Sequence, residues 1–192
     1  FSISGLSPDL LFTLLVVREG YSATFVRKHD PAKEPAIAAL KKRAPIADPK
    51  QAVLGKVVDK NGNPVRDAVV SQQGAIFEMG RAFGDNNWID LIAVSNREGE
   101  FELAYNKPIA AAVVEVAPRA MAPTLATLQT GTQRQTVTVT DGSTLRGRLV
   151  SSGKPVPNAE LVLTTHSRTS GTTFKEVRIG TNAKGEFAFT NV

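Results

Sequence analysis

The chain has no cysteine and only two histidines among its 192 residues. Without cysteine, the disulfide-stabilised class of small secreted domains and every cysteine-based metal site are excluded. The histidines, His29 and His166, lie far apart in the sequence, and neither belongs to a zinc-binding spacing such as His-Glu-x-x-His. A Gly-x-Ser-x-Gly nucleophile motif is also missing. We therefore expect a protein that is not an enzyme, with no catalytic residues, no metal and no cofactor.

Long apolar stretches are missing as well. The longest, residues 10–17, falls far short of the ~20 apolar residues that a membrane-spanning helix needs. It is typical of a buried strand, so we expect no membrane span in this segment. The 23 basic and 18 acidic residues are dispersed, with a tight basic cluster at residues 41–43, and aromatic residues make up 6% of the chain. Because nucleic-acid platforms interleave basic and aromatic side chains, we expect no specific nucleic-acid partner.

What the sequence does contain is a long repeated pattern. Residues 53–70 return as residues 144–162, with one residue deleted in the turn, and residues 96–101 return as residues 182–187. The matching positions of the first segment are Gly55, Val57, Gly62, Pro64, Val65 and Ala68, and those of the second are Gly147, Leu149, Gly153, Pro155, Val156 and Ala159. The two glycines that open the pattern are 92 residues apart. That spacing is the size of a small β-sandwich, and self-similarity on this scale indicates an array of like units.

Alternation of apolar and polar residues predicts a succession of short strands between turn residues. The expected strands are residues 54–58, 69–70, 91–94, 100–103, 110–116, 125–128 and 135–139. Residues 59–64 predict a hairpin turn, since Asn-Gly supplies a positive φ and proline fixes the chain as it leaves. Residues 71–90 are expected to be a looser stretch. Residues 34–43 fit either a short helix or an extended linker.

These patterns divide the chain into three blocks. Residues 1–48 are predicted to be the C-terminal part of a preceding β-sandwich unit plus a linker, because residues 1–6 are similar to 187–192 and residues 13–17 to 112–116. Residues 49–140 form one complete unit, and residues 141–192 the N-terminal part of a following unit. We expect a piece of a longer array. The alternative is that the incomplete end units complete each other by strand exchange, within a chain or between neighbours.

The frame Gly-x-Val-x-Asp-x-x-Gly-x-Pro-Val-x-x-Ala-x-Val, followed by Asn-x-x-Gly-Glu-Phe, resembles that of carboxypeptidase regulatory-like domains. The residues that carry the resemblance are Gly55, Val57, Asp59, Gly62, Pro64, Val65, Ala68, Val70, Asn96, Gly99 and Phe101, with their partners in the last block. It implies tandem transthyretin-like (prealbumin-like), Ig-like Greek-key β-sandwiches, an all-β fold. Family members are non-catalytic modules of secreted peptidases, receptors and surface proteins. Asn96 and Asn182 replace a common family aspartate, which argues against metal there.

Two short segments are candidate binding sites. The middle loop offers the candidate ligand contacts Asp85, Asn86, Asn87, Trp88 and Asp90. An exposed tryptophan flanked by amides suits stacking on a sugar or a peptide side chain, and the alternative is that Trp88 folds back and caps the core. Three side chains with oxygen atoms in residues 59–63 have the spacing found at the start of an EF-hand calcium loop. However, a proline follows them, and the twelfth position of the loop has no glutamate. A hairpin turn is the preferred interpretation of that segment.

Together these features favour a non-catalytic structural or interaction repeat of a secreted, periplasmic or cell-surface bacterial protein, serving as stalk, spacer, adhesive section or assembly unit. The expected partners are a protein or glycan at the cell surface and the neighbouring repeats, with self-association by strand exchange as a further option. The alternative function is a carbohydrate- or peptide-binding accessory or regulatory module of a larger metallopeptidase or receptor. The β-prone residues 136–140 are expected to be an ordinary strand, with edge-to-edge assembly as the alternative.

Overall fold

The computed structural model describes residues 3–18, 20–33, 35–83, 90, 92–166 and 173–192. The chain divides into two compact units, each described by itself below. Unit 1 comprises Phe1–Arg119 and Thr124–Val139, and unit 2 comprises Ala120–Pro123 and Thr140–Val192. The three-block organisation inferred from the sequence remains a prediction.

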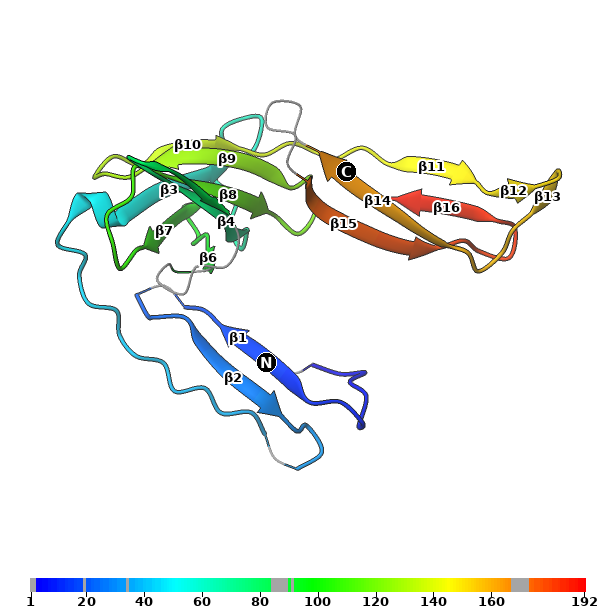
Figure 1. Ribbon diagram of the computed structural model, residues 1–192, viewed down its shortest axis with the longest axis horizontal. Helices are drawn as coiled ribbons and strands as arrows, with labels where there is room; N and C mark the ends of the chain where they lie inside the picture. Colours follow the sequence, from blue (N-terminus) through cyan, green and yellow to red (C-terminus); the bar gives the residue numbers. More distant parts are fainter. Residues whose placement is uncertain (1–2, 19, 34, 84–89, 91, 167–172) are drawn as a thin grey trace. The chain divides into compact units, whose positions relative to one another are not determined.

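The described residues of unit 1 form two larger sheets and an N-terminal hairpin, and the all-β prediction is confirmed (Figure 1). The first has the order β10-β3-β7, with β3 (Ala52–Val58), β7 (Glu100–Ala104) and β10 (Gln135–Thr138). β7 runs antiparallel to β3, and β10 runs parallel to it. The second has the order β5-β4-β8-β9, with β6 also paired to β4. Its strands are β4 (Val69–Phe77), β5 (Gly80–Phe83), β6 (Ile92–Val94), β8 (Ala111–Ala117) and β9 (Thr124–Gln129).

The core of unit 1 is a layer of branched side chains between these two sheets, as in a β-sandwich. The largest fully buried side chains are Val53, Val57 and Leu103 from the first sheet, Val70, Val114 and Val116 from the second, and Val139 just after β10. One expectation is wrong: part of the looser stretch at 71–90 belongs to β4 and β5. Gly74 and Ala75 are buried and pair with β8, so tertiary pairing outweighs the polar character of the preceding residues.

The N-terminal part of unit 1 is a hairpin. Its strands are β1 (Phe12–Val16) and β2 (Thr24–His29), which pair antiparallel. The chain then returns alongside in extended form, and Ser22 N donates to Lys41 O at 2.9 Å. The described residues 35–43 contain no helix, so of the two interpretations of 34–43 the extended one holds. A single 3-10 turn, Pro49–Gln51, leads into β3 with Asp48 as its N-cap. No helix over the described ranges is long and apolar enough to cross a membrane.

The described residues of unit 2 form three two-stranded sheets. β11 (Leu145–Arg148) pairs with β16 (Glu186–Phe189), β14 (Glu160–His166) with β15 (Thr173–Gly180), and β12 (Val150–Ser151) with β13 (Lys154–Pro155). All three pairs are antiparallel. By the sequence repeat, β11, β14 and β16 are the counterparts of β3, β4 and β7.

The two segments that match in sequence share one structural feature above all, which we name the glycine–phenylalanine hub. Gly55 lies directly opposite Phe101 across β3 and β7, and Gly147 lies opposite Phe187 across β11 and β16. In both pairs the ring covers the glycine, so closely that a Cβ on Gly55 would be 2.1 Å from the ring of Phe101 and one on Gly147 would be 2.4 Å from that of Phe187. Glycine is needed because the aromatic ring occupies the place of its side chain.

The hub also includes a hydroxyl group, which in unit 1 connects the loop between β3 and β4 to the turn between β6 and β7. Ala68 N donates to Ser95 Oγ at 2.9 Å, and that hydroxyl donates to Val65 O at 2.8 Å. In unit 2, Thr181 makes the same two bonds to the counterpart residues at 2.9 and 2.8 Å. Both hydroxyl residues are buried. Each therefore satisfies one backbone donor and one backbone acceptor in a buried or part-buried position.

An asparagine closes the turn that follows the hydroxyl. Asn96 Oδ1 accepts bonds from the N–H groups two and four residues later, at 3.0 and 2.8 Å. Asn182 Oδ1 does the same at 2.9 and 3.0 Å. The turn ends at Gly99 or Gly185, with φ of 77° and 73°, a region that favours glycine. The amide oxygen at this position is thus engaged in organising the turn.

Candidate functional site

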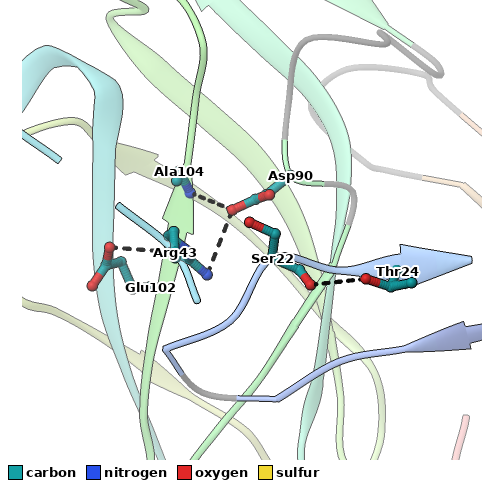
Figure 2. Close-up of polar contacts among 6 residues, drawn as sticks. All are labelled: Ser22, Thr24, Arg43, Asp90, Glu102 and Ala104. Atoms are coloured by element: carbon teal, nitrogen blue, oxygen red, sulfur yellow. Dashed lines mark hydrogen bonds and ion pairs between the residues drawn. The ribbon is translucent and has the colours of Figure 1, made fainter. Parts of the chain in front are cut away.

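The predicted contact loop is only partly described by the structure. Asp85, Asn86, Asn87 and Trp88 lie outside the described residues, and their role as ligand contacts remains a prediction. Asp90 is described, and its carboxylate binds the end of β7 (Figure 2). Asp90 Oδ2 accepts a hydrogen bond from the backbone N–H of Ala104 at 3.1 Å, and Asp90 N donates to Ala104 O at 3.0 Å.

Arg43 joins Asp90 from a distant part of the sequence (Figure 2). Its Nη2 lies 3.6 Å from Asp90 Oδ2, and its Nη1 lies 3.2 Å from Glu102 Oε1 on β7. Its backbone N–H donates to Gly20 O at 2.9 Å. The guanidinium of Arg43 therefore connects Asp90 to Glu102 on β7, and the backbone of the same residue binds the hairpin at Gly20. Sequence reasoning saw Arg43 as part of a basic cluster and gave it no partner.

Two buried polar atoms beside this cluster have no hydrogen-bond partner among the described residues: Arg43 Nε and the hydroxyl of Tyr105. Burial raises the pKa of the Tyr105 phenol far above its ordinary value, and the negative charge of Asp90 raises that pKa further. The phenol is therefore neutral at physiological pH. Such unsatisfied donors mark a place where a polar ligand atom or a water gains a bond on arrival.

A pocket of about 250 Å³ opens next to Arg43 in unit 1. Residues from the hairpin, from the returning segment and from β6 and β7 line it: Val17, Arg18, Gly20, Arg43, Ala44, Pro45, Ala93, Val94, Glu100, Phe101, Glu102 and Arg134. Arg134 Nε is bound to Glu100 Oε1 at 3.1 Å. The lining combines arginine and glutamate side chains with apolar ones. It therefore suits a ligand that has both a small polar group and an apolar part.

The turn at residues 59–63 has the form of a hydrogen-bonded hairpin turn. Asp59 Oδ1 accepts from the N–H groups of Asn61 and Asn63 at 2.8 and 2.9 Å, and Oδ2 accepts from Asn63 Nδ2 at 2.9 Å. The Asn63 side-chain bond, with the backbone bonds, lowers the pKa of Asp59 below its ordinary value. Over the part of the chain that the structure describes, no three histidine, aspartate or glutamate side chains gather as a metal site.

Two sheet edges are also candidates for interaction. β10, which contains most of the β-prone segment 136–140, is the outermost strand of its sheet and pairs with β3. β14 pairs with β15 alone among the described residues, although its counterpart β4 is paired on both sides.

No protein-family model matches the chain, and no curated protein matches it. Among solved structures, the chain is similar to the Bacillus anthracis TIE protein, with 15% identity and a TM-score of 0.32 over 72% of this chain and 25% of that one. It is also similar to the streptococcal ancillary pilin, with 15% identity and a TM-score of 0.28 over 97% of this chain and 60% of that one. The chain thus spans less than two thirds of either bacterial protein, and both likenesses are weak.

Proposed function

We propose that this chain is a non-catalytic structural and interaction repeat of a secreted or cell-surface bacterial protein, in which tandem β-sandwich units serve as stalk, spacer or adhesive section. The observation that carries the proposal is the hub, which recurs in both units with the same partners and nearly the same distances. Units built around a self-contained connection can be added one after another, because each needs only its neighbours.

The carboxypeptidase regulatory-like resemblance of the sequence supports this proposal, since such modules are expected in tandem on exported proteins. The absence of cysteine agrees with a unit whose connections are held by buried hydrogen bonds instead of disulfides. The proposed partners are the neighbouring repeats and a protein or glycan at the cell surface.

Single-molecule stretching of the 192-residue chain between its ends tests the load-bearing role. A stalk unit should resist until one sharp rupture releases the sandwich of unit 1, lengthening the chain by roughly 300 Å for its ~90 residues. The Ser95→Ala variant should rupture at lower force with the same gain in length, whereas Ser95→Thr should match the original. A featureless extension at low force would contradict a load-bearing role.

The pocket beside Arg43 favours a second candidate function, a peptide- or carbohydrate-binding accessory module. The arginine and glutamate side chains that line it offer both charge and hydrogen bonding to an incoming group. Peptide and glycan arrays test this function directly. Binding lost in Arg43→Met but kept in Arg97→Met, an exposed arginine outside the pocket, would support it, and equal signals for both variants would exclude this pocket.

A further inference from the structure

One edge of β7 faces away from its sheet, because β7 is the outermost strand in the order β10-β3-β7. The bonds next to both ends of β7 show which residues turn toward β3. Tyr105 N donates to Gln51 O at 2.9 Å. Val57 N donates to Gly99 O at 2.8 Å. In an antiparallel ladder the bonded positions alternate, so the odd-numbered residues from 99 to 105 bond to β3 and the even-numbered ones direct their N–H and C=O groups to the outer edge.

Both ends of this outer edge are already paired. At one end, Ala104 N donates to Asp90 Oδ2 at 3.1 Å, and Ala104 O accepts from Asp90 N at 3.0 Å. At the other end, Glu100 N donates to Asn96 Oδ1 at 2.8 Å, and Glu100 O accepts from Asn96 N at 2.8 Å. Glu102 lies between them, and its backbone N–H and C=O have no hydrogen-bond partner among the described residues. The edge therefore offers one donor and one acceptor, enough to pair with one residue of an arriving chain.

This open residue belongs to the wall of the pocket of about 250 Å³ beside Arg43. The same wall includes apolar side chains that are not buried: Val17, Ala44, Pro45 and Val94. Of the lining residues that the structure describes, Phe101 alone is aromatic, and it is 4% exposed. A sugar ring would therefore find no aromatic face to stack on, whereas a small aliphatic side chain would contact hydrocarbon.

The charges that line the pocket favour an anion over a cation. Glu102 Oε1 lies 3.2 Å from Arg43 Nη1, and Glu100 Oε1 lies 3.1 Å from Arg134 Nε. Both lining carboxylates therefore already have an arginine partner. Arg18, the third lining arginine, has no ion-pair partner among the described residues. An arriving carboxylate gains charge-assisted hydrogen bonds from Arg18, whereas an arriving ammonium group would compete with an arginine for each glutamate.

We infer that this pocket binds the carboxyl-terminal residue of a peptide that ends in a small aliphatic amino acid. The N–H of that terminal residue donates to Glu102 O, and one oxygen of its carboxylate accepts from Glu102 N, as in a hydrogen-bonded pair of an antiparallel ladder. The other carboxylate oxygen accepts from the Arg18 guanidinium. The aliphatic side chain packs against Val94 and Pro45, which line the same pocket.

The end of a chain fits this edge better than the middle of a strand does. Asp90 and Asn96 occupy the edge on both sides of Glu102, so a longer strand would find no open backbone group two residues further in either direction. The pocket volume also lies below the range of about 300–1,000 Å³ that holds a drug-sized ligand. One backbone pair contributes little net affinity, so the terminal carboxylate has to supply much of it. This inference rests on the second candidate function, a binding module with its site at this pocket, and names its ligand.

Fluorescence polarisation with labelled pentapeptides tests the inference. The probes carry the label at the amino end and finish in glycine-alanine-valine, with either a free carboxylate or a carboxamide. We expect the free acid to bind with a Kd below ~1 mM and the carboxamide to bind at least ~10-fold more weakly. Methylation of the last backbone nitrogen should cause a loss of similar size, because it removes the donor to Glu102 O. Methylation of the preceding nitrogen, which faces away from β7, should change the Kd less than ~2-fold.

Two exposed arginines of the N-terminal hairpin give a matched pair of variants. The guanidinium carbon of Arg18 lies 5.3 Å from the ring centre of Tyr21, and that of Arg27 lies 4.6 Å from the ring centre of Phe25. Of the two arginines, only Arg18 lines the pocket. Arg18→Gln should weaken binding of the free acid at least ~10-fold and leave binding of the carboxamide unchanged. Arg27→Gln should change the Kd of either probe less than ~2-fold.

Three results would overturn the inference: equal binding of the free acid and the carboxamide, an equal response to Arg18→Gln and Arg27→Gln, or no binding of the free acid up to ~1 mM. After any of them, the binding-module function still stands if peptide or glycan arrays show binding that is lost in Arg43→Met. That function fails together with the inference only if Arg43→Met changes no array signal.

Discussion

Replacing Gly55 by alanine is the most direct test of the hub. The added Cβ would lie 2.1, 2.4 and 2.8 Å from three carbons of the Phe101 ring. To reach an ordinary contact of about 3.5 Å, the ring must retreat by more than ~1 Å. Phe101 is buried, so that movement has to displace the neighbouring core. Overpacking of this kind costs about 1–3 kcal/mol of unfolding free energy.

Unit 2 contains a matched control. A Cβ on Gly147 would lie 2.4, 2.8 and 3.1 Å from the Phe187 ring, but that ring is partly exposed and can turn toward solvent. The entropic gain of about 0.4–1 kcal/mol from removing a glycine offsets most of the remaining strain. We therefore expect Gly147→Ala to be nearly neutral while Gly55→Ala destabilises unit 1.

Native-state hydrogen exchange measures the stability of each unit separately. A single melting curve of a two-unit chain does not separate the two stabilities. The reporter in unit 1 is the N–H of Val57, which donates to Gly99 O at 2.8 Å, and in unit 2 the N–H of Leu149, which donates to Gly185 O at 2.8 Å. Gly55→Ala should lower protection at Val57 by about 1–3 kcal/mol and leave Leu149 unchanged.

A double-mutant cycle with Phe101→Leu tests whether the Phe101 ring causes the destabilisation by Gly55→Ala. Leucine keeps the core filled at a cost below about 1.5 kcal/mol but removes the aromatic edge that the new Cβ would meet. The penalty of Gly55→Ala should shrink by at least half in this background. An undiminished penalty would show that glycine is required for its backbone and would refute the steric argument.

Three further predictions concern the turns. Ser95→Ala should cost about 1–3 kcal/mol, because it leaves a buried N–H and C=O unpaired, while Ser95→Thr should be nearly neutral in urea unfolding, since unit 2 uses threonine there. Gly99→Ala should cost more than Gly62→Ala: both have positive φ, but only at Gly99 would the Cβ meet a backbone oxygen, at 2.4 Å. Carboxyl NMR should give Asp59 a pKa below its ordinary value, because Asn63 binds the charged form. The stability that the charged Asp59 side chain adds is present above the unfolded pKa of about 3.9 and is lost as pH falls through the folded pKa. Asp59→Asn should therefore make the unfolding free energy fall less steeply in acid.

The turn glycines, the Pro-Val step and the Gly-Glu-Phe close were predictable because each is a local signal. Gly62 has the positive φ expected of an Asn-Gly turn, and Phe101 and Leu103 both point into the core as their spacing in a strand requires. The full length of β4 was not predictable, because its polar start is held in the sheet by pairing with β8. The contact of Arg43 with Glu102 spans 59 residues, and no periodicity or motif signals an ion pair at that separation.

A comparison of the two units shows that the hub forms whether or not the surrounding side chains are fully buried. Thr181 keeps both bonds of Ser95 at the same distances, although strands that complete the sandwich in unit 1 have no described counterpart in unit 2. The hub therefore depends on residues within its own segment, because it forms both where Val70 is fully buried and where its counterpart Leu161 is half-buried.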